Sequence, residues 1–255
     1  MSGADQVKAA GRTLDLFEAL AAARGPLSLT ELSSRIGVPI SSCHALVRTL
    51  QSRGYVYVLD ERKRIYPTKR LAALGQSFAR HDPVLERVRV ILAQLAEDTG
   101  ETVILGKHQG DHVIYLDVLE GKHTVRFNAS PGDVRPAHSS AIGKSALSLL
   151  SDAELKRVIA RMKLDQVTDQ TITDPEALHL DIVAGRKRGY FISRGETVSD
   201  VMGLSIAQRL GEELYAIGVA GPISRLEEHR DKYVRRLKQG GAEVARLDAE
   251  LRGAA

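Results

Sequence analysis

The segment Pro136–Ser145, PAHSSAIGKS, gathers residue types that can do chemistry. Its end, Gly143-Lys144-Ser145, matches the end of a phosphate-binding loop. That motif needs another glycine five residues before Gly143, where His138 stands, and a strand that runs directly into it. Both features are missing from the sequence pattern, so nucleotide binding is not expected here.

His138 and Ser140 could also be interpreted as a base and a nucleophile. A serine hydrolase needs an acid that orients the histidine and commonly places its serine in a G-x-S-x-G turn. The sequence marks neither feature, and two such residues this close together usually form hydrogen bonds within a loop. No catalytic residue is therefore assigned.

A third interpretation makes Ser140 the start of a helix. The first N–H groups of a helix lack partners and favour negative charge. Hydroxyls of Ser139 and Ser140 beside the N–H groups of Ala141 and Ile142 would suit a small anion, for which a carboxylate is the natural choice. This interpretation predicts a binding site for a small organic acid.

Metal and redox chemistry find little support in the sequence. Cys43 is the single cysteine, which excludes an internal disulfide and a cysteine-based zinc cluster. It lies among apolar residues and is expected to be a small core side chain. Four other histidines lack the spacing of metal ligands and are expected to be solvated: His108, His112, His123 and His179. We expect no metal and no cofactor.

Three helices are predicted in the first 54 residues. Apolar side chains recur at helical spacing along residues 7–23 and are expected to be buried: Ala10, Leu14, Phe17 and Leu20. Ser28 and Glu31 form a capping-box pattern at the start of the second helix. The third helix follows Pro39, and its apolar stripe consists of Cys43, Leu46, Val47 and Leu50. With a tight turn at Gly37, the last two helices outline a helix-turn-helix.

A β-hairpin is predicted directly after the third helix. Residues 55–59 are rich in β-branched and aromatic residues, residues 60–64 form a polar and basic turn, and residues 65–67 return as a second strand. A basic hairpin at this place is typical of a wing. Residues 1–70 are therefore predicted to be a winged helix-turn-helix domain.

The apolar stripe of the third helix determines which of its side chains face outward. Hydroxyl groups and an arginine suit phosphate and base-edge contacts in the major groove, although any of these side chains could simply be solvated. The residues expected to contact DNA, including the helix start and the wing, are Ser28, Ser41, Ser42, His44, Ala45, Arg48, Arg62, Lys63 and Arg64.

The charge distribution favours a polyanion partner for the first part of the chain. Residues 1–75 carry 11 Lys and Arg against 6 Asp and Glu, whereas the remainder carries 25 against 26. A basic small domain beside a near-neutral large one suits double-stranded DNA. No apolar run approaches the roughly 20 residues of a membrane span, and the first residues lack the apolar core of a signal peptide. We expect a cytoplasmic protein without membrane contact.

Residues 71–83 are predicted to be a helical linker and residues 84–255 a second domain of the α+β class. Strands are predicted over residues 102–107, 112–119, 124–128, 190–194, 201–208 and 214–220. Helices are predicted over 84–100 and 141–150 and after three capping-box pairs, Ser151/Glu154, Thr173/Glu176 and Ser224/Glu227. The short turns between strands indicate antiparallel pairing rather than a doubly wound parallel sheet.

Over essentially its whole length the sequence resembles the IclR family of transcriptional regulators. The N-terminal part of this resemblance is carried by residues 10–17, 29–37 and 39–46. The family usually has a basic residue where Ile40 stands and an arginine where Ala45 stands. This departure bears on the operator sequence and leaves the DNA-binding role in place.

The resemblance implies a ligand-responsive repressor or activator with a GAF-like antiparallel sheet flanked by helices in its second domain. It implies that this domain binds a small organic or aromatic acid, that an acidic loop borders the pocket, and that two strand residues contribute to its wall. The expected effector-binding residues are His138, Ser139, Ser140, Ala141, Ile142, Glu196, Asp200, Ser205 and Gly218.

A homodimer or a dimer of dimers is also expected. A lone helix-turn-helix covers few base pairs, and two copies double the footprint. The apolar residues Leu71, Leu74 and Phe78 have no evident apolar segment nearby in the sequence to pack against. They are therefore assigned to contacts between protomers or between domains. The alternative function is a small-molecule enzyme with an appended DNA-binding domain, but the sequence contains no complete catalytic set.

Overall fold

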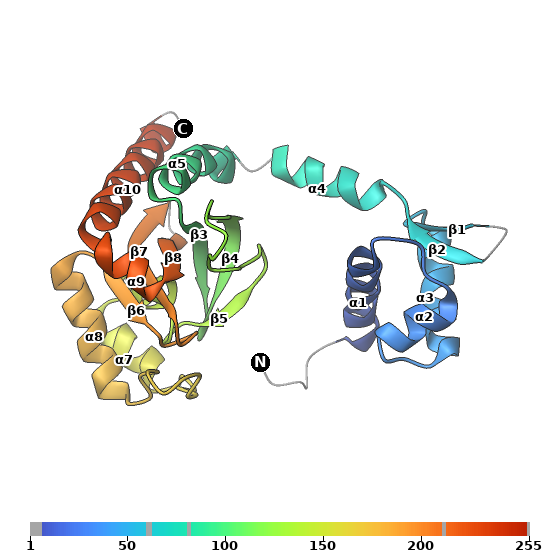
Figure 1. Cartoon of the computed structure of the whole chain (residues 1–255), viewed down its shortest axis with the longest axis horizontal. Coiled ribbons are helices and arrows are strands. Elements are labelled where there is room, and N and C mark those ends of the chain that lie inside the picture. Colours follow the sequence, from blue (N-terminus) through green and yellow to red (C-terminus); the bar gives the residue numbers. More distant parts are fainter. Residues whose placement is uncertain (1–6, 60–62, 81–82, 211–212, 254–255) are drawn as a thin grey trace. The chain divides into compact units, whose positions relative to one another are not determined.

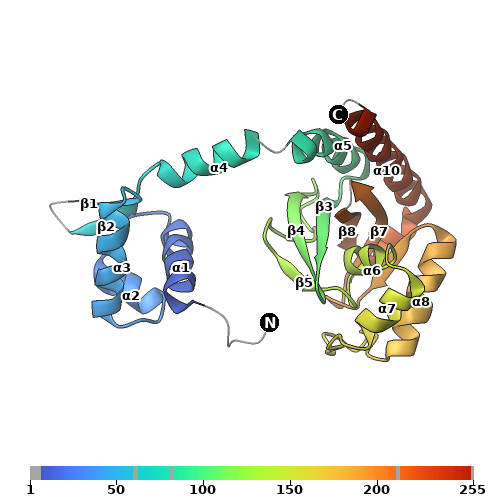
Figure 2. The same ribbon diagram turned by 180° about the vertical axis from the view of Figure 1, so that it is seen from behind.

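A computed structural model describes residues 7–59, 63–80, 83–210 and 213–253. Contacts divide the chain into two compact units, Met1–Pro83 and Val84–Ala255, and each is described by itself. Figures 1 and 2 show the elements of both units from opposite sides.

The first unit combines short helices with one hairpin. Its elements are α1 (Lys8–Ala23), α2 (Leu29–Arg35), α3 (Ile40–Ser52), β1 (Val56–Leu59), β2 (Arg64–Pro67) and α4 (Arg70–Arg80). The predicted capping box is confirmed, because the Ser28 hydroxyl accepts a hydrogen bond from the Glu31 N–H and the Glu31 carboxylate accepts one from the Ser28 N–H. The two strands pair in antiparallel fashion, with Val56 opposite Pro67.

One apolar core holds the first three helices to the hairpin. Cys43 is fully buried in it, as expected, and burial raises the pKa of its thiol. Two predictions for α1 were wrong. Ala10 is exposed and Leu14 is 63% exposed, and Leu16 and Leu20 are the buried leucines of this helix. Leu14 and Leu16 point to nearly opposite sides of the helix, each side carries further apolar residues, and only the packed neighbours decide which side is buried.

The second unit is built on one antiparallel sheet of six strands. These are β3 (Thr102–Gln109), β4 (His112–Leu119), β5 (Val134–Pro136), β6 (Phe191–Arg194), β7 (Val201–Leu210) and β8 (Glu213–Pro222). Their order in the sheet is β5-β4-β3-β8-β7-β6, so strands from both halves of the unit meet where β3 pairs with β8.

Helices cover both faces of this sheet. They are α5 (Pro83–Thr99), α6 (Ala141–Leu147), α7 (Asp152–Ile159), α8 (Pro175–Arg188), α9 (Ile223–Glu228) and α10 (Arg230–Gly253). Side chains of β3 alternate between the faces. Val103 and Leu105 pack in the core beside α5 and α10, whereas Ile104 packs with Ile142 of α6. In both views α5 and α10 lie side by side.

The strand predicted over residues 124–128 is wrong. In the structure this segment is irregular, and its carbonyl groups accept hydrogen bonds from side chains. Thr102 Oγ1 donates to the Phe127 carbonyl at 2.6 Å, and Arg225 Nη2 donates to the Val125 carbonyl at 2.9 Å. The edge of the sheet is instead β5, which pairs with β4 inside the stretch expected to be a loop.

Helix starts were predicted with mixed success. The Ser151/Glu154 capping box is confirmed. For α8 the cap is Asp174, whose carboxylate accepts from the Ala177 N–H at 2.7 Å, and not Thr173. The predicted cap at Ser224 is also wrong, because α9 begins at Ile223 without a side-chain cap and Glu227 instead binds Arg194 at 2.6 Å.

Candidate functional site

Helix α6 lies unusually close to the sheet because two strand residues lack side chains. A Cβ built at Gly106 of β3 would lie 2.4 Å from Ile142 Cγ2, and one built at Gly218 of β8 would lie 2.5 Å from Ile142 Cδ1. Both distances are shorter than real carbon–carbon contacts. The two glycines therefore make the room that Ile142 occupies, and they place the start of α6 against the middle of the sheet.

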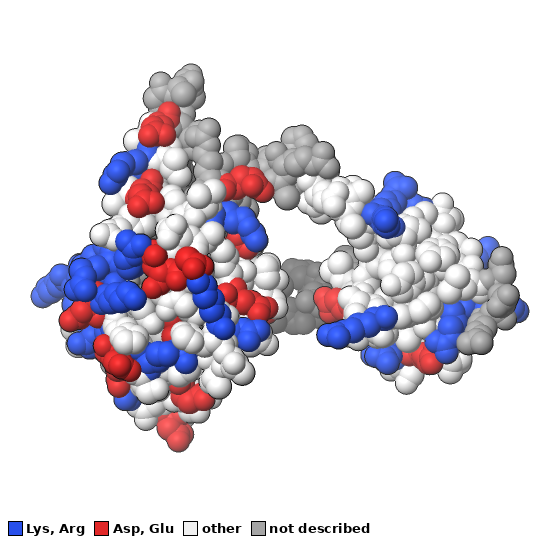
Figure 3. Space-filling view, turned by 45° about the horizontal axis from the view of Figure 1, so that its top comes forward, with Lys and Arg blue, Asp and Glu red and all other residues white. Residues whose placement is uncertain are grey.

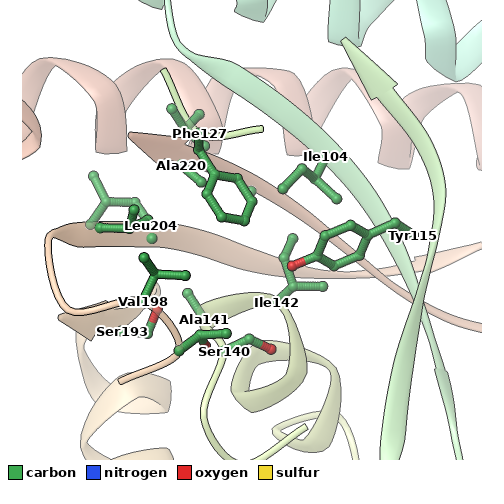
Figure 4. Close-up of a pocket in the computed structure, with 15 residues that line it drawn as sticks. Ile104, Tyr115, Phe127, Ser140, Ala141, Ile142, Ser193, Val198, Leu204 and Ala220 are labelled. Carbon is green, nitrogen blue, oxygen red and sulfur yellow. The ribbon is translucent and has the colours of Figure 1, made fainter. Parts of the chain in front are cut away.

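A narrow pocket, partly open to solvent, lies beside the start of α6 (Figure 4). Residues of five strands, of the start of α6 and of two loop segments meet there. The lining residues are Ile104, Tyr115, Phe127, Ser140, Ala141, Ile142, Ser193, Thr197, Val198, Val201, Gly203, Leu204, Gly218, Val219 and Ala220. An apolar wall with a few hydroxyl groups is the composition expected of a small-ligand site.

Ser140 caps α6 at the edge of this pocket. Its hydroxyl accepts a hydrogen bond from the Gly143 N–H at 3.1 Å and donates to the Pro136 carbonyl at 3.3 Å. The first N–H groups of a helix have no partner within the helix, and Ser140 satisfies the one on Gly143. The N–H groups of Ala141 and Ile142, the first two of α6, also lack a partner within the helix, and both residues line the pocket.

Tyr115 carries a phenol group that Figure 4 shows turned toward the pocket. Burial raises its pKa to about 12, with Arg135 close enough to oppose part of that increase. The hydroxyl is therefore protonated at neutral pH. It offers the pocket a neutral hydrogen-bonding group on the side formed by β4.

Phe127 closes the pocket from the irregular segment that was predicted to be a strand. The Thr102 hydroxyl holds the Phe127 carbonyl, and Arg225 holds the segment at Val125. Arg225 is itself paired with the fully buried carboxylate of Glu101. Because the buried Glu101 carboxylate fixes the Arg225 guanidinium, Arg225 can hold the segment that contains Val125 and Phe127 beside the pocket.

The structure brings Ser140, Ala141, Ile142 and Gly218 into the pocket wall, and it places the other five expected residues elsewhere. His138 is 1% exposed, and its Nε2 lies 3.0 Å from the Asp165 carbonyl. Burial lowers the pKa of this histidine, which favours its neutral form. Ser139 is buried and its carbonyl accepts from the Thr197 hydroxyl at 2.8 Å.

The acidic loop and the strand serine also have partners outside the pocket. Glu196 binds the buried Lys144, and burial, the main effect, raises the pKa of its carboxyl. Asp200 is exposed and is not in the pocket wall. Ser205 Oγ lies 2.8 Å from Ser145 Oγ and donates to the Ile217 carbonyl at 2.9 Å, so it joins β7 to α6.

Sequence reasoning missed most of the wall because those residues look like ordinary core. Ile104, Leu204 and Val219 follow strand patterns with no mark of a ligand. The usable signal was the presence of small residues at Gly203, Gly218 and Ala220 on two neighbouring buried strands. Glycine inside a strand often marks a place where another part of the chain or a ligand approaches the backbone closely, and here α6 does so.

A second candidate site is the outer face of α3. Ser41, His44, Ala45 and Arg48 are exposed and Ser42 is half-buried, as the buried stripe of Cys43, Val47 and Leu50 requires. A shallow surface hollow follows the same face toward the end of the helix and is lined by Ala45, Arg48, Thr49, Gln51 and Ser52. Figure 3 shows several Lys and Arg side chains on the first unit beside few acidic ones.

The wing residues differ in how free they are. Lys63 is exposed, with a left-handed backbone at φ 47°. Arg64 instead turns back onto its own unit, where Nη1 donates to the Pro26 carbonyl at 2.7 Å and lies 3.4 Å from Glu31 Oε2. Ser28 is engaged in capping α2. Arg62 lies outside the described residues.

The part of the chain that the structure describes contains neither a metal-binding cluster nor a membrane-spanning helix. No cluster there of three or more His, Cys, Asp or Glu side chains is arranged to hold a metal ion. Within the same residues, no helix has the length and apolar character needed to cross a membrane.

The two units together define a class of protein, the transcriptional regulator with a helix-turn-helix domain and an effector-binding domain. Residues 9–60 match the IclR helix-turn-helix domain, and residues 76–246 match the family described as the bacterial transcriptional regulator IclR C-terminal domain. The chain belongs to the IclR family of transcriptional regulators.

Relatives and solved structures agree with this assignment. The HTH-type transcriptional regulator BhcR of Paracoccus denitrificans is 34% identical over 226 residues, which cover 88% of this chain and 81% of that protein. The transcriptional repressor IclR of Escherichia coli is 33% identical over 229 residues, covering 88% and 84%.

Among solved structures, the Thermotoga maritima IclR aligns with a TM-score of 0.79 at 24% identity, covering 94% of this chain and 98% of that one. An IclR homologue from Microbacterium hydrocarbonoxydans complexed with 4-hydroxybenzoate aligns with a TM-score of 0.73 at 20% identity, covering 96% and 100%. These likenesses show the shared fold.

Proposed function

We propose that this regulator senses a small carboxylic acid with an apolar body, bound in the pocket beside α6, and that it has no catalytic activity of its own. The observation that carries the proposal is the pocket wall, which combines apolar side chains with Ala141 and Ile142 at the start of α6, where N–H groups have no partner within the helix. Apolar atoms favour a hydrophobic ligand body, and a helix start favours a negative group. The complex of a homologue with 4-hydroxybenzoate supports this ligand class.

Calorimetric titration of the full-length chain tests the ligand class. The probes are 4-hydroxybenzoate and 4-hydroxybenzyl alcohol, which share a ring and a phenol and differ in the carboxylate. The acid is expected to bind and the alcohol to bind at least about tenfold more weakly, since charge-assisted hydrogen bonds exceed neutral ones. Equal binding of both would refute the requirement for a carboxylate, and an active-site role would instead be indicated by chemical conversion of a probe.

We further propose that α3 and the wing bind double-stranded DNA in the cytoplasm, with Ser41, His44 and Arg48 at the bases and Lys63 at the phosphates. The exposed outer face of α3 and the basic character of the first unit support this assignment. Arg64 is removed from the direct contacts because Pro26 and Glu31 already engage it. Fluorescence anisotropy with DNA selected from a random pool tests each residue.

We also propose that the chain forms a homodimer or a dimer of dimers through exposed apolar residues of α4. Leu71, Leu74 and Phe78 of α4 are all exposed, and Phe78 is 71% exposed. An apolar stripe of this kind on a helix is typical of contacts between protomers. Light scattering at micromolar concentration is expected to give a dimer or tetramer for the native chain. A shift toward monomer is expected for Phe78→Lys, and a native chain that is monomeric with and without DNA would refute the proposal.

A further inference from the structure

Lys144 of α6 is a charged side chain enclosed by the protein. It is 1% exposed, and its Nζ lies 2.7 Å from Glu196 Oε1 and 2.8 Å from Asp181 Oδ2. The Ile192 carbonyl accepts a longer contact at 3.5 Å. One ammonium group thus joins α6 to α8, to β6 and to the loop that follows β6.

That loop, Gly195–Asp200, contributes to the pocket on one side only. Thr197 and Val198 line the pocket, whereas neither Glu196 nor Lys144 does. Glu196 is 7% exposed, and its second carboxylate oxygen, Oε2, is buried without a hydrogen-bond partner among the described residues. The carboxylate is therefore held by Lys144.

Neutral hydrogen bonds hold the loop backbone at its start. Thr168 Oγ1 donates to the Gly195 carbonyl at 2.6 Å and Thr171 Oγ1 donates to the Glu196 carbonyl at 2.7 Å. The Thr197 hydroxyl donates to the Ser139 carbonyl at 2.8 Å, which ties the loop to the residues just before α6. The loop and the start of α6 form adjacent parts of one pocket wall (Figure 4).

We propose that Lys144 is a positioning residue of the effector pocket, which holds Thr197 and Val198 in the pocket wall through its ion pair with Glu196. A buried charge that loses its partner is strongly destabilising, because the protein has already removed it from water. Without Lys144, the Glu196 carboxylate moves toward solvent, and the adjacent Thr197 and Val198 move with it. The consequence for effector affinity rests on the proposed function, but the effect on the loop does not.

Hydrogen–deuterium exchange of the full-length chain without ligand tests the loop. Lys144→Met keeps the length of the side chain and removes its charge. Amides of residues 195–201 are expected to exchange about tenfold faster in this variant, as expected for local opening. The double variant Lys144→Met/Glu196→Met removes the buried Glu196 carboxylate as well. It leaves only Asp181 without an ion-pair partner, and the Asp181 side chain is 27% exposed and can be solvated. Exchange in the double variant is therefore expected to return toward that of the native chain.

The double variant separates positioning from packing. If Lys144 served only to fill space, the second substitution would leave exchange as fast as in Lys144→Met or make it faster. Arg236→Met is the matched control, since it breaks the ion pair of Arg236 with Asp98 in the same unit away from the pocket. It is expected to leave exchange at residues 195–201 unchanged.

Calorimetry with 4-hydroxybenzoate gives the second readout. Lys144→Met is expected to weaken binding about tenfold, and the double variant is expected to recover most of that loss. If the native chain does not bind this acid, the proposed ligand class fails while the exchange experiment still decides the role of Lys144.

Native-like exchange at residues 195–201 in Lys144→Met would overturn the proposal, as would a double variant no slower than the single one. If Lys144→Met does not fold, Glu196→Ala replaces it, because Lys144 then keeps Asp181 as its partner. Faster loop exchange at an unchanged melting temperature is expected for Glu196→Ala, and unchanged exchange would overturn the proposal.

Discussion

Gly218→Ala is expected to destabilise the second unit by crowding Ile142. The added Cβ would lie 2.5 Å from Ile142 Cδ1 and 3.1 Å from the Leu204 carbonyl oxygen. The carbonyl belongs to the sheet backbone and cannot move aside cheaply, so Ile142 must give way. Its other side is closed by β3, where a Cβ at Gly106 would already lie 2.4 Å from Cγ2. Ile142 is therefore pushed toward the pocket that it lines.

The magnitude follows from two opposing effects. Overpacking a close-packed core costs about 1–3 kcal/mol. Replacing glycine by alanine also reduces the freedom of the unfolded chain, which returns about 0.4–1 kcal/mol. The expected net loss is about 1–2 kcal/mol. For a unit of this size 1 kcal/mol lowers the melting temperature by about 2–4 °C.

Differential scanning calorimetry of the full-length chain measures this change, because the two units can unfold in separate transitions. Gly218→Ala/Ile142→Val removes Cδ1, the atom in closest contact, and should be less destabilised than the sum of the single variants. Gly11→Ala is the control, since a Cβ there has nothing within 4 Å, and it should be neutral or stabilising. The reasoning is refuted if Gly218→Ala melts like the native chain, or if the two substitutions are simply additive.

Three other outcomes are expected. Ala141→Trp should fill the pocket and abolish binding of 4-hydroxybenzoate in calorimetry while DNA binding without ligand persists; unchanged acid binding would place the effector elsewhere. Lys63→Ala should reduce the slope of log DNA affinity against log salt concentration by about 0.9 per chain. Arg64→Ala should mainly lower the melting temperature of the first unit, because Arg64 binds the Pro26 carbonyl. An equal change of the slope in both variants would contradict the assignment of Arg64. The pKa of Tyr115 is raised to about 12 from 10, so its contribution to stability is complete below pH 10 and is lost as the pH rises toward 12. Between pH 10 and pH 12 the native chain should therefore lose about 2–3 kcal/mol more free energy of unfolding than Tyr115→Phe, as measured by urea unfolding. Parallel curves of unfolding free energy against pH for the two chains would exclude the raised pKa of Tyr115.

The sequence by itself determined the elements whose signals are local. The Ser28/Glu31 and Ser151/Glu154 caps, the turns at glycines and the apolar stripe of α3 depend on neighbours within one helical turn, and the structure has them where the pattern predicted. The outward face of α3 followed from the same periodicity. Family resemblance predicted an effector pocket around the start of α6, and the structure has a pocket at that place.

Only the tertiary structure decided the rest, because it depended on contacts between distant residues. Residues 124–128 look like a strand, but Thr102 and Arg225 take the carbonyl groups that a strand would have paired. Leu14 and Leu16 lie on opposite sides of α1, and the packed core buries the side that carries Leu16. Lys144 looked like part of a phosphate-binding loop, yet its charge is buried because Asp181 and Glu196, far along the chain, meet it from α8 and the loop after β6. A buried charge is stable only beside its partners, and no local pattern records where those partners are.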